Sequence, residues 1–325
     1  MKLQGIACLL ALTGLVSLTH TASAQTTVDP NLLPYRVPNE QLRGKITLIG
    51  SNTMAQVAAV WGDNFRRLNP GVEIDIQIKG AVNAVPSVMS GEATFGMMSR
   101  PITQEEVIAF NEKFGYAPTV LTPSLEPIAI YVHKDNPVQS LTLAQVDQIY
   151  STSLRRGAKQ TAMTWGDVGA TGQWAQVAIK PLGRSDTTGS QVFIQQAVLG
   201  GGTFRDDLVN IENNLDLVKQ VGADQRAIGF AGSMFEIPEA RAVKIAWRDG
   251  DAAFDVHTAG YPLVRPLQLV VNHAPQKEMT PVEREFLKYV FSRQGQEAVH
   301  IAGFISVPAR PAEVALQAVE IKTLN

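Results

Sequence analysis

ITLIGSNTMAQVAAVWGDNFRRLNPGVEIDIQI, residues 46–78, decides the fold because a strand, a turn, a helix and a second strand follow one another in it. Residues 46–49 are a short apolar strand, and apolar side chains then recur at helical spacing from Met54 to Leu68. Asn69-Pro70-Gly71 ends this helix, and residues 72–78 alternate between apolar and polar side chains, as a half-buried strand does. The stretch therefore predicts the first β-α-β unit of an α/β protein.

The same alternation of strands and helices continues toward the C-terminus. Three pairs of residues have the capping-box pattern that starts a helix: Thr103 with Glu106, Thr142 with Gln145, and Thr280 with Glu283. Strands are predicted over residues 127–133, 177–182, 227–231 and 267–272, and helices over residues 190–199 and 214–221. We expect α/β lobes, each a mostly parallel sheet flanked by helices.

The composition narrows the class of partner. The 325 residues include 28 basic and 30 acidic side chains, and neither sign is gathered in a block that would favour nucleic acid or a membrane surface. Cys8 is the one cysteine and lies in the first 24 residues, so disulfides and thiolate chemistry are excluded from the rest. The histidines show no metal-binding spacing. A small molecule is the leading class of partner.

The first 24 residues have the pattern of a cleaved export signal. Lys2 is followed by an apolar run over residues 6–18 and by Ala22-Ser23-Ala24, an A-x-A cleavage site. The run is too short and too often interrupted to span a bilayer. We expect a periplasmic or secreted protein that begins near Gln25, with a proline-marked leader over residues 25–43 before the folded body.

Two turns between a strand and a helix have the composition of an anion site. They are residues 51–54 and residues 188–190. The first N–H groups of a helix lack partners and carry positive partial charge, so an anion is favoured there. Arg184 adds a permanent charge, and its planar fork can hold a tetrahedral oxyanion through two parallel hydrogen bonds. The alternative is that the polar side chains in these turns only cap their helices.

Several segments resemble the phosphate-binding protein of the bacterial Pst-type ABC transporter, a type II periplasmic binding protein. The most specific is residues 184–190, which match the family pattern R-x-D/E-x-S/T-G-S/T. The others are residues 50–54, 99–102, 131–137, 227–230, 261–267 and 294–296. Their order and spacing also fit the family, so the resemblance covers nearly all of the chain after the predicted signal.

The resemblance implies two lobes with a phosphate or similar oxyanion in the cleft between them. Lobe I would contain residues 44–126 and 263–325, and lobe II residues 127–262. The cleft would close on the ligand, and an ABC transporter permease would be the partner. The binding residues that the resemblance implies are Ser51, Asn52, Thr53, Met54 and Ser99 on lobe I, and Arg184, Asp186, Thr188, Gly189 and Ser190 on lobe II. Asp186 would either accept the proton of a phosphate oxygen or orient Arg184.

Two departures from the family leave the choice of oxyanion open. Ala81 stands where a serine donor is usual, and no aspartate lies near Ser99 and Arg100, where some members have one. Arg100 itself would contact the ligand or form a salt bridge. No nucleophile beside a base and no metal motif is visible, so we predict a monomeric binding protein with no catalytic residue, metal or cofactor. A phosphatase-like enzyme and an adhesion or matrix protein on the same fold are the alternatives.

Overall fold

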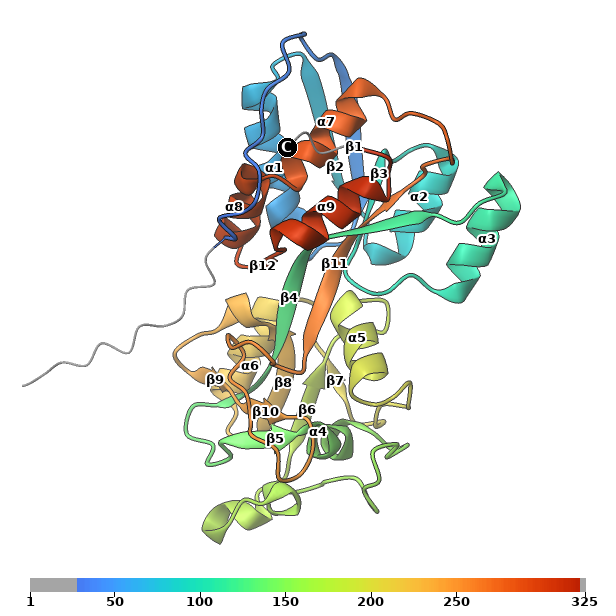
Figure 1. The fold of residues 1–325 in the computed structure, drawn as a ribbon. Helices are drawn as coiled ribbons and strands as arrows, with labels where there is room; N and C mark the ends of the chain where they lie inside the picture. The colour runs from blue at the N-terminus through green and yellow to red at the C-terminus, as the bar shows by residue number, and fades with distance from the viewer. Residues whose placement is uncertain (1–27, 322–325) are drawn as a thin grey trace, which may run out of the picture.

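The computed structural model describes residues 28–321, and the predicted signal peptide with its cleavage site near Ala24 lies outside them. The chain passes through one half of the molecule, then the other, and returns to the first (Figure 1). The first passage contains β1 (Gly44–Gly50), α1 (Ala55–Leu68), β2 (Val72–Ile78), η1 (Ala81–Asn83), α2 (Ala84–Ser90), β3 (Phe95–Met98), α3 (Gln104–Phe114) and β4 (Thr119–His133).

The second half and the return contain the remaining elements. These are β5 (Ser140–Thr142), α4 (Leu143–Tyr150), η2 (Trp165–Val168), η3 (Gly172–Gln176), β6 (Lys180–Gly183), α5 (Gly189–Ala197), β7 (Val209–Asn210), α6 (Asn214–Ala223), β8 (Ala227–Gly232), η4 (Ser233–Phe235), β9 (Ala240–Ala242), β10 (Lys244–Ala246), β11 (Val264–Val271), α7 (Pro281–Val290), α8 (Arg293–Ile301), β12 (Ile305–Ser306) and α9 (Ala309–Gln317). The three predicted capping boxes are present at the starts of α3, α4 and α7.

One mixed sheet runs through both halves. Its order is β2-β1-β3-β11-β4-β8-β6-β7, and β9 and β12 also pair with β4. Neighbouring strands are parallel within β2-β1-β3 and within β8-β6-β7, and antiparallel where β11 and β4 join these groups. The predicted α/β class is confirmed. The middle of the sheet is antiparallel because the chain crosses between the halves twice, in opposite directions.

β4 is the strand that joins the two halves. Its first part pairs with β11 and β12, and its second part pairs with β8 and β9. The sequence predicted only residues 127–133 of it. β4 passes Pro123 at a bulge, because Leu121 pairs with Leu269 and Ser124 with Leu267, which leaves two residues of β4 opposite one of β11. A proline is tolerated there because a bulge does not need its N–H for the ladder.

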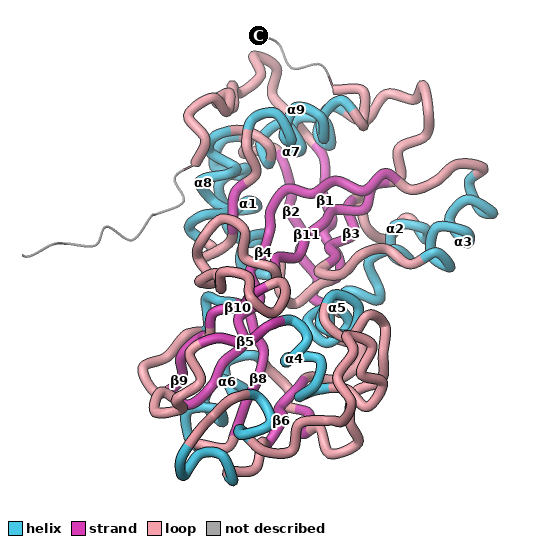
Figure 2. Tube along the Cα trace, turned by 60° about the horizontal axis from the view of Figure 1, so that its bottom comes forward, coloured by secondary structure: helices cyan, strands magenta, loops and turns pink. Residues whose placement is uncertain are grey.

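The two halves, which the crossing strands join (Figure 2), have separate groups of buried apolar side chains. One contains residues from Ile128 to Leu263. The other half is filled by residues 32–121 together with residues 267–321. Since the two halves do not share a core, each can keep its shape if the other moves relative to it.

The leader over residues 28–43 has no helix or strand, yet it packs on the first half. Leu32, Tyr35 and Leu42 are buried. The Tyr35 N–H donates to Gln294 Oε1 at 2.8 Å, and the Arg293 N–H donates to Leu33 O at 2.9 Å. These contacts attach the leader to the start of α8.

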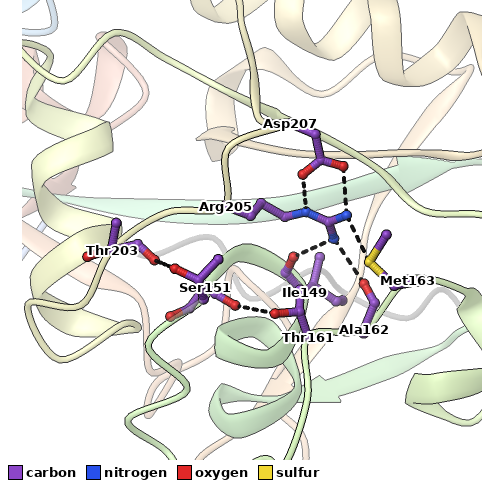
Figure 3. A network of polar contacts seen from close by, with 9 residues as sticks. Ile149, Ser151, Thr161, Ala162, Met163, Thr203, Arg205 and Asp207 are labelled. Atoms are coloured by element: carbon purple, nitrogen blue, oxygen red, sulfur yellow. Dashed lines mark hydrogen bonds and ion pairs between the residues drawn. The ribbon is translucent and has the colours of Figure 1, made fainter.

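A buried arginine holds the long connection between α4 and β6 (Figure 3). The Arg205 guanidinium donates to Ile149 O at 3.1 Å and to Ala162 O at 2.9 Å. It also forms a bidentate ion pair with Asp207 at 2.5 and 2.8 Å. Because a buried carbonyl without a donor costs free energy, this network makes an otherwise irregular segment stable.

Candidate functional site

The predicted residues of lobe I lie at the ends of two neighbouring parallel strands. Ser51 follows β1 and Ser99 follows β3, and both are buried. Ser51 Oγ accepts a hydrogen bond from the Thr53 N–H at 3.2 Å and donates to Ser99 Oγ at 2.8 Å. Because Ser99 Oγ accepts this bond, its own proton is available to a further acceptor.

The two helices that begin in the predicted turns have no side-chain cap. α1 begins after Met54 and α5 after Thr188, and at neither end does a side chain accept a hydrogen bond from the first turn. The Thr188 hydroxyl donates instead to Ser185 O at 2.8 Å. The capping alternative is therefore wrong for these two turns. Their positively polarised ends suit an anionic ligand.

Arg184 is buried just after β6, and lobe II holds its side chain. Its Nε donates to Ile211 O at 2.9 Å and its Nη2 to Glu212 O at 2.6 Å, while Nη1 donates to Asn214 Oδ1. Burial, and after it the charge of Arg265, lowers the pKa of Arg184 from its ordinary value. These bonds use three of the five N–H groups of the guanidinium, and two are left for a ligand.

Three of the predicted residues are placed differently from the rest. Asn52 and Asp186 are exposed. Met54 is buried in the core, so only its backbone N–H could serve a ligand. Arg184 is oriented by carbonyl and amide oxygens of residues 211–214 and not by Asp186. The other role of Asp186, as acceptor of a hydrogen bond from a protonated phosphate oxygen, stays a prediction.

The two lobes touch where these residues converge. Gly189 is the first residue of α5 and lies against Ser99, since a methyl group at position 189 would stand 2.2 Å from Ser99 Oγ and 2.7 Å from Ser99 O. Ser190, the next residue, is buried. The uncapped end of α5 therefore lies directly beside the hydroxyl groups of lobe I.

Two buried residues that the sequence analysis did not assign complete the site. Arg265 on β11 donates from Nη1 to Ser99 O at 2.8 Å and from Nη2 to Thr53 Oγ1 at 3.2 Å. Glu126 on β4 accepts from Arg265 Nε at 2.8 Å and lies 2.6 Å from its Nη2. Each of the two residues is only 1% exposed. Residues 261–267 resemble the family as a segment, but no sequence pattern shows that Arg265 meets a carboxylate 139 residues away.

Arg100 and Ala81 lie beside the site without completing it. Arg100 forms a bidentate ion pair with Glu106 at 2.6 and 2.9 Å. Of the two predicted roles, ligand contact and salt bridge, the structure therefore shows the salt bridge. Ala81 is buried close to the end of β1, where the N–H of Gly80 donates to Gly50 O at 2.9 Å. A serine at position 81 would have added a donor, and the alanine methyl adds none.

The chemistry of this arrangement is that of anion binding. Hydroxyl groups and a helix N-terminus supply donors. Of the two buried guanidinium groups, Arg265 is paired with Glu126, whereas the carboxylate whose charge acts on Arg184, Glu212, is exposed, so Arg184 has no buried counter-ion among the described residues. Such a charge in a low dielectric is stabilised by an anion. Within residues 28–321 no cluster of metal-ligating side chains occurs. In the same range no helix is long and apolar enough to cross a bilayer.

The fold and the site define a two-lobed binding protein for a small anion. Residues 22–294 match the model of the PBP superfamily domain. The phosphate-binding protein PstS of Pseudomonas aeruginosa is 35% identical over 322 residues, which are 98% of this chain and 99% of that protein. The chain belongs to the PBP superfamily and, within it, to the PstS family of phosphate-binding proteins.

Solved structures have the same fold. A putative phosphate ABC transporter substrate-binding protein from Clostridium perfringens, with bound phosphate, superimposes with a TM-score of 0.65 at 23% identity and covers 81% of this chain and 100% of its own. A high affinity periplasmic phosphate-binding protein (PfluDING), also with phosphate, has a TM-score of 0.60 at 11% identity and covers 83% of this chain and 92% of its own. These relatives are binding proteins, the class that the sequence predicted for this chain.

Proposed function

We propose that this chain binds inorganic phosphate, or a tetrahedral oxyanion like it, between its two lobes and delivers it to an ABC transporter permease. What supports the proposal most directly is the meeting of Ser99 with Gly189, because it brings the hydroxyl donors of lobe I against the uncapped start of α5. The proposed ligand residues are Ser51, Asn52, Thr53, Met54, Ser99, Arg184, Asp186, Thr188, Gly189 and Ser190. Asn52 and Asp186 would have to turn inward, and Met54 would contribute its backbone N–H.

The proposed motion is closure of lobe II on lobe I about the crossing strands. The proposed boundaries near residues 127 and 262 fall where β4 changes partners and where β11 is about to begin. Only these two segments have to bend, because each lobe has its own core. We further propose that the protein works in the periplasm after cleavage near Ala24.

The test is calorimetric titration of phosphate and sulfate into the ligand-stripped mature chain. We expect one phosphate bound per chain and weaker binding of sulfate, together with a smaller radius of gyration in solution scattering when phosphate is added. Absence of phosphate binding would overturn the proposal. Turnover of a phosphate monoester above the uncatalysed rate would favour the phosphatase-like alternative instead.

A further inference from the structure

Arg265 occupies a place in the molecule that its role as a buried ion pair does not explain. Its guanidinium donates to Thr53, in the turn before α1, and to Ser99, directly after β3. Both residues belong to the proposed ligand set. A methyl group at Gly189 would stand 3.0 Å from Arg265 Nη1. One side chain thus bonds two of the ten proposed ligand residues, both in lobe I, and lies close to a third, Gly189, in lobe II.

The hydrogen bonds of Arg265 determine what the Thr53 hydroxyl can do. Arg265 Nη2 donates to Thr53 Oγ1, so this oxygen is used as an acceptor and its proton must be donated elsewhere. Ser99 Oγ is in the same state because it accepts from Ser51. Both hydroxyl groups are therefore prepared as donors before any ligand arrives, which suits an oxyanion and disfavours a cation or a neutral donor.

Arg265 is also preorganised. Glu126 accepts a hydrogen bond from Arg265 Nε and forms an ion pair with Nη2, and the contacts of Arg265 with Glu126, Thr53 and Ser99 all lie within lobe I. The guanidinium therefore does not have to be ordered when the ligand binds, and this reduces the entropy lost on binding. Its charge also acts on Arg184 and, after burial, contributes to the lowered pKa of that side chain.

We propose that Arg265 is a positioning and specificity residue of the oxyanion site: it directs the Thr53 hydroxyl at the ligand as a donor and adds a second guanidinium charge that favours a dianion. This inference rests on the proposed function, since it needs phosphate as the ligand. It concerns which ionisation state of phosphate the site prefers and which residue outside the ligand set enforces the preference.

The test compares Arg265→Met and Arg265→Lys with the unchanged protein, by titration of phosphate at about pH 5.5 and about pH 8.5, where the monoanion and the dianion dominate. We expect Arg265→Met to weaken binding about 100-fold at the higher pH and only about 10-fold at the lower. Arg265→Lys should retain the dianion preference and lose about 10-fold at both. If Arg265 only stabilised the fold, Arg265→Met would lower both affinities by the same factor, and that result would overturn the charge role.

A double-mutant cycle tests the positioning role. Thr53→Val removes the hydroxyl and keeps its shape, so Arg265→Lys in that background should cost no more than about 3-fold if Arg265→Lys acts through Thr53. Additive losses would overturn the positioning role. Arg205→Lys is the matched control, because Arg205 is equally a buried arginine with a carboxylate partner, and its contacts lie in lobe II. It should lower the melting temperature and leave phosphate affinity unchanged.

The outcomes separate this inference from the proposed function. If the unchanged protein does not bind phosphate, both fall together. If it binds phosphate and Arg265→Met binds it equally well at both pH values, only the inference is overturned. If Arg265→Met fails to fold, the double-mutant cycle of Arg265→Lys and Thr53→Val still decides the positioning role. The charge role is then refuted if Arg265→Lys, which keeps the positive charge, loses the preference for the dianion.

Discussion

Gly189→Ala is the sharpest perturbation that the site offers. The added methyl would stand 2.2 Å from Ser99 Oγ, 2.7 Å from Ser99 O and 3.0 Å from Arg265 Nη1. Ordinary contacts of a carbon atom are about 3.5 Å, so the start of α5 must retreat from lobe I by about 1 Å. The methyl would occupy the space in which Ser99 now lies against the start of α5.

The retreat is large compared with the tolerance of a hydrogen bond. A donor that moves from about 2.9 Å to about 3.9 Å no longer forms one. If two charge-assisted bonds from the N-terminus of α5 to the ligand are lost at about 1.5–3 kcal/mol each, the cost is about 3–6 kcal/mol. This is roughly a 10²- to 10⁴-fold loss of phosphate affinity.

If the lobes stand apart without ligand, as the proposed motion requires, the ligand-free protein should not be destabilised by the same change. Gly189 does not have a positive φ, and alanine is the better helix former by up to about 1 kcal/mol. Titration calorimetry measures the affinity, and thermal unfolding without phosphate measures the stability. Gly62→Ala is the matched control, since its methyl would stand 3.0 Å from Ile74 Cγ2 inside lobe I. Unchanged affinity in a folded Gly189→Ala protein would refute the closed arrangement.

Three further predictions concern single side chains. Arg184→Ala should weaken phosphate binding by about 2–4 kcal/mol and also lower the melting temperature, because Ile211 O and Glu212 O lose their donor. An unchanged phosphate affinity would refute the assignment of Arg184 as a ligand-binding cation. Asp186→Asn should raise sulfate affinity and lower the preference for phosphate if Asp186 accepts the phosphate proton, whereas a constant ratio of the two affinities would contradict that role. The hydrogen bond from Arg205 lowers the pKa of Asp207 in the folded protein. The ionised carboxylate therefore stabilises the fold at a pH above its pKa in the unfolded chain, and this stabilisation is lost as the pH falls through its pKa in the folded protein. Asp207→Asn should therefore lower the melting temperature near neutral pH and have no effect in strong acid, and an equal effect at both would argue against the ion pair.

The elements that the sequence predicted well are those whose signal is local. The capping boxes at Thr103, Thr142 and Thr280 are each contained in four residues, and all three are present. The crossing strands were harder, since β4 owes its length to pairing with β11, more than a hundred residues later. The antiparallel middle of the sheet follows from the same pairing. A pattern of apolar residues gives the period of a strand but not its partner or direction.

The candidate site divides in the same way. Turns at the ends of β1 and β6 could be recognised because a strand, small polar residues and a helix follow one another in sequence. Arg265 and Glu126 could not, because each lies within a strand and the contact between them joins distant parts of the chain. The exposure of the side chains could also not be predicted from the sequence. Asp186 and Arg184 share a short loop, yet Asp186 is exposed and Arg184 is buried.

The Arg265–Glu126 pair of lobe I also lies beside two glycines of lobe II. Gly189 lies against Arg265, and Gly232 at the end of β8 lies against Glu126, where a methyl group would stand 2.3 Å from Oε1. At both points the residue of lobe II beside the pair is a glycine, so any side chain there would crowd Arg265 or Glu126. Because the pair is fixed within lobe I, the proposed closure would bring Arg184 and the start of α5 to a half-site that is already formed. An anion between the lobes would then offset the mutual repulsion of Arg184 and Arg265.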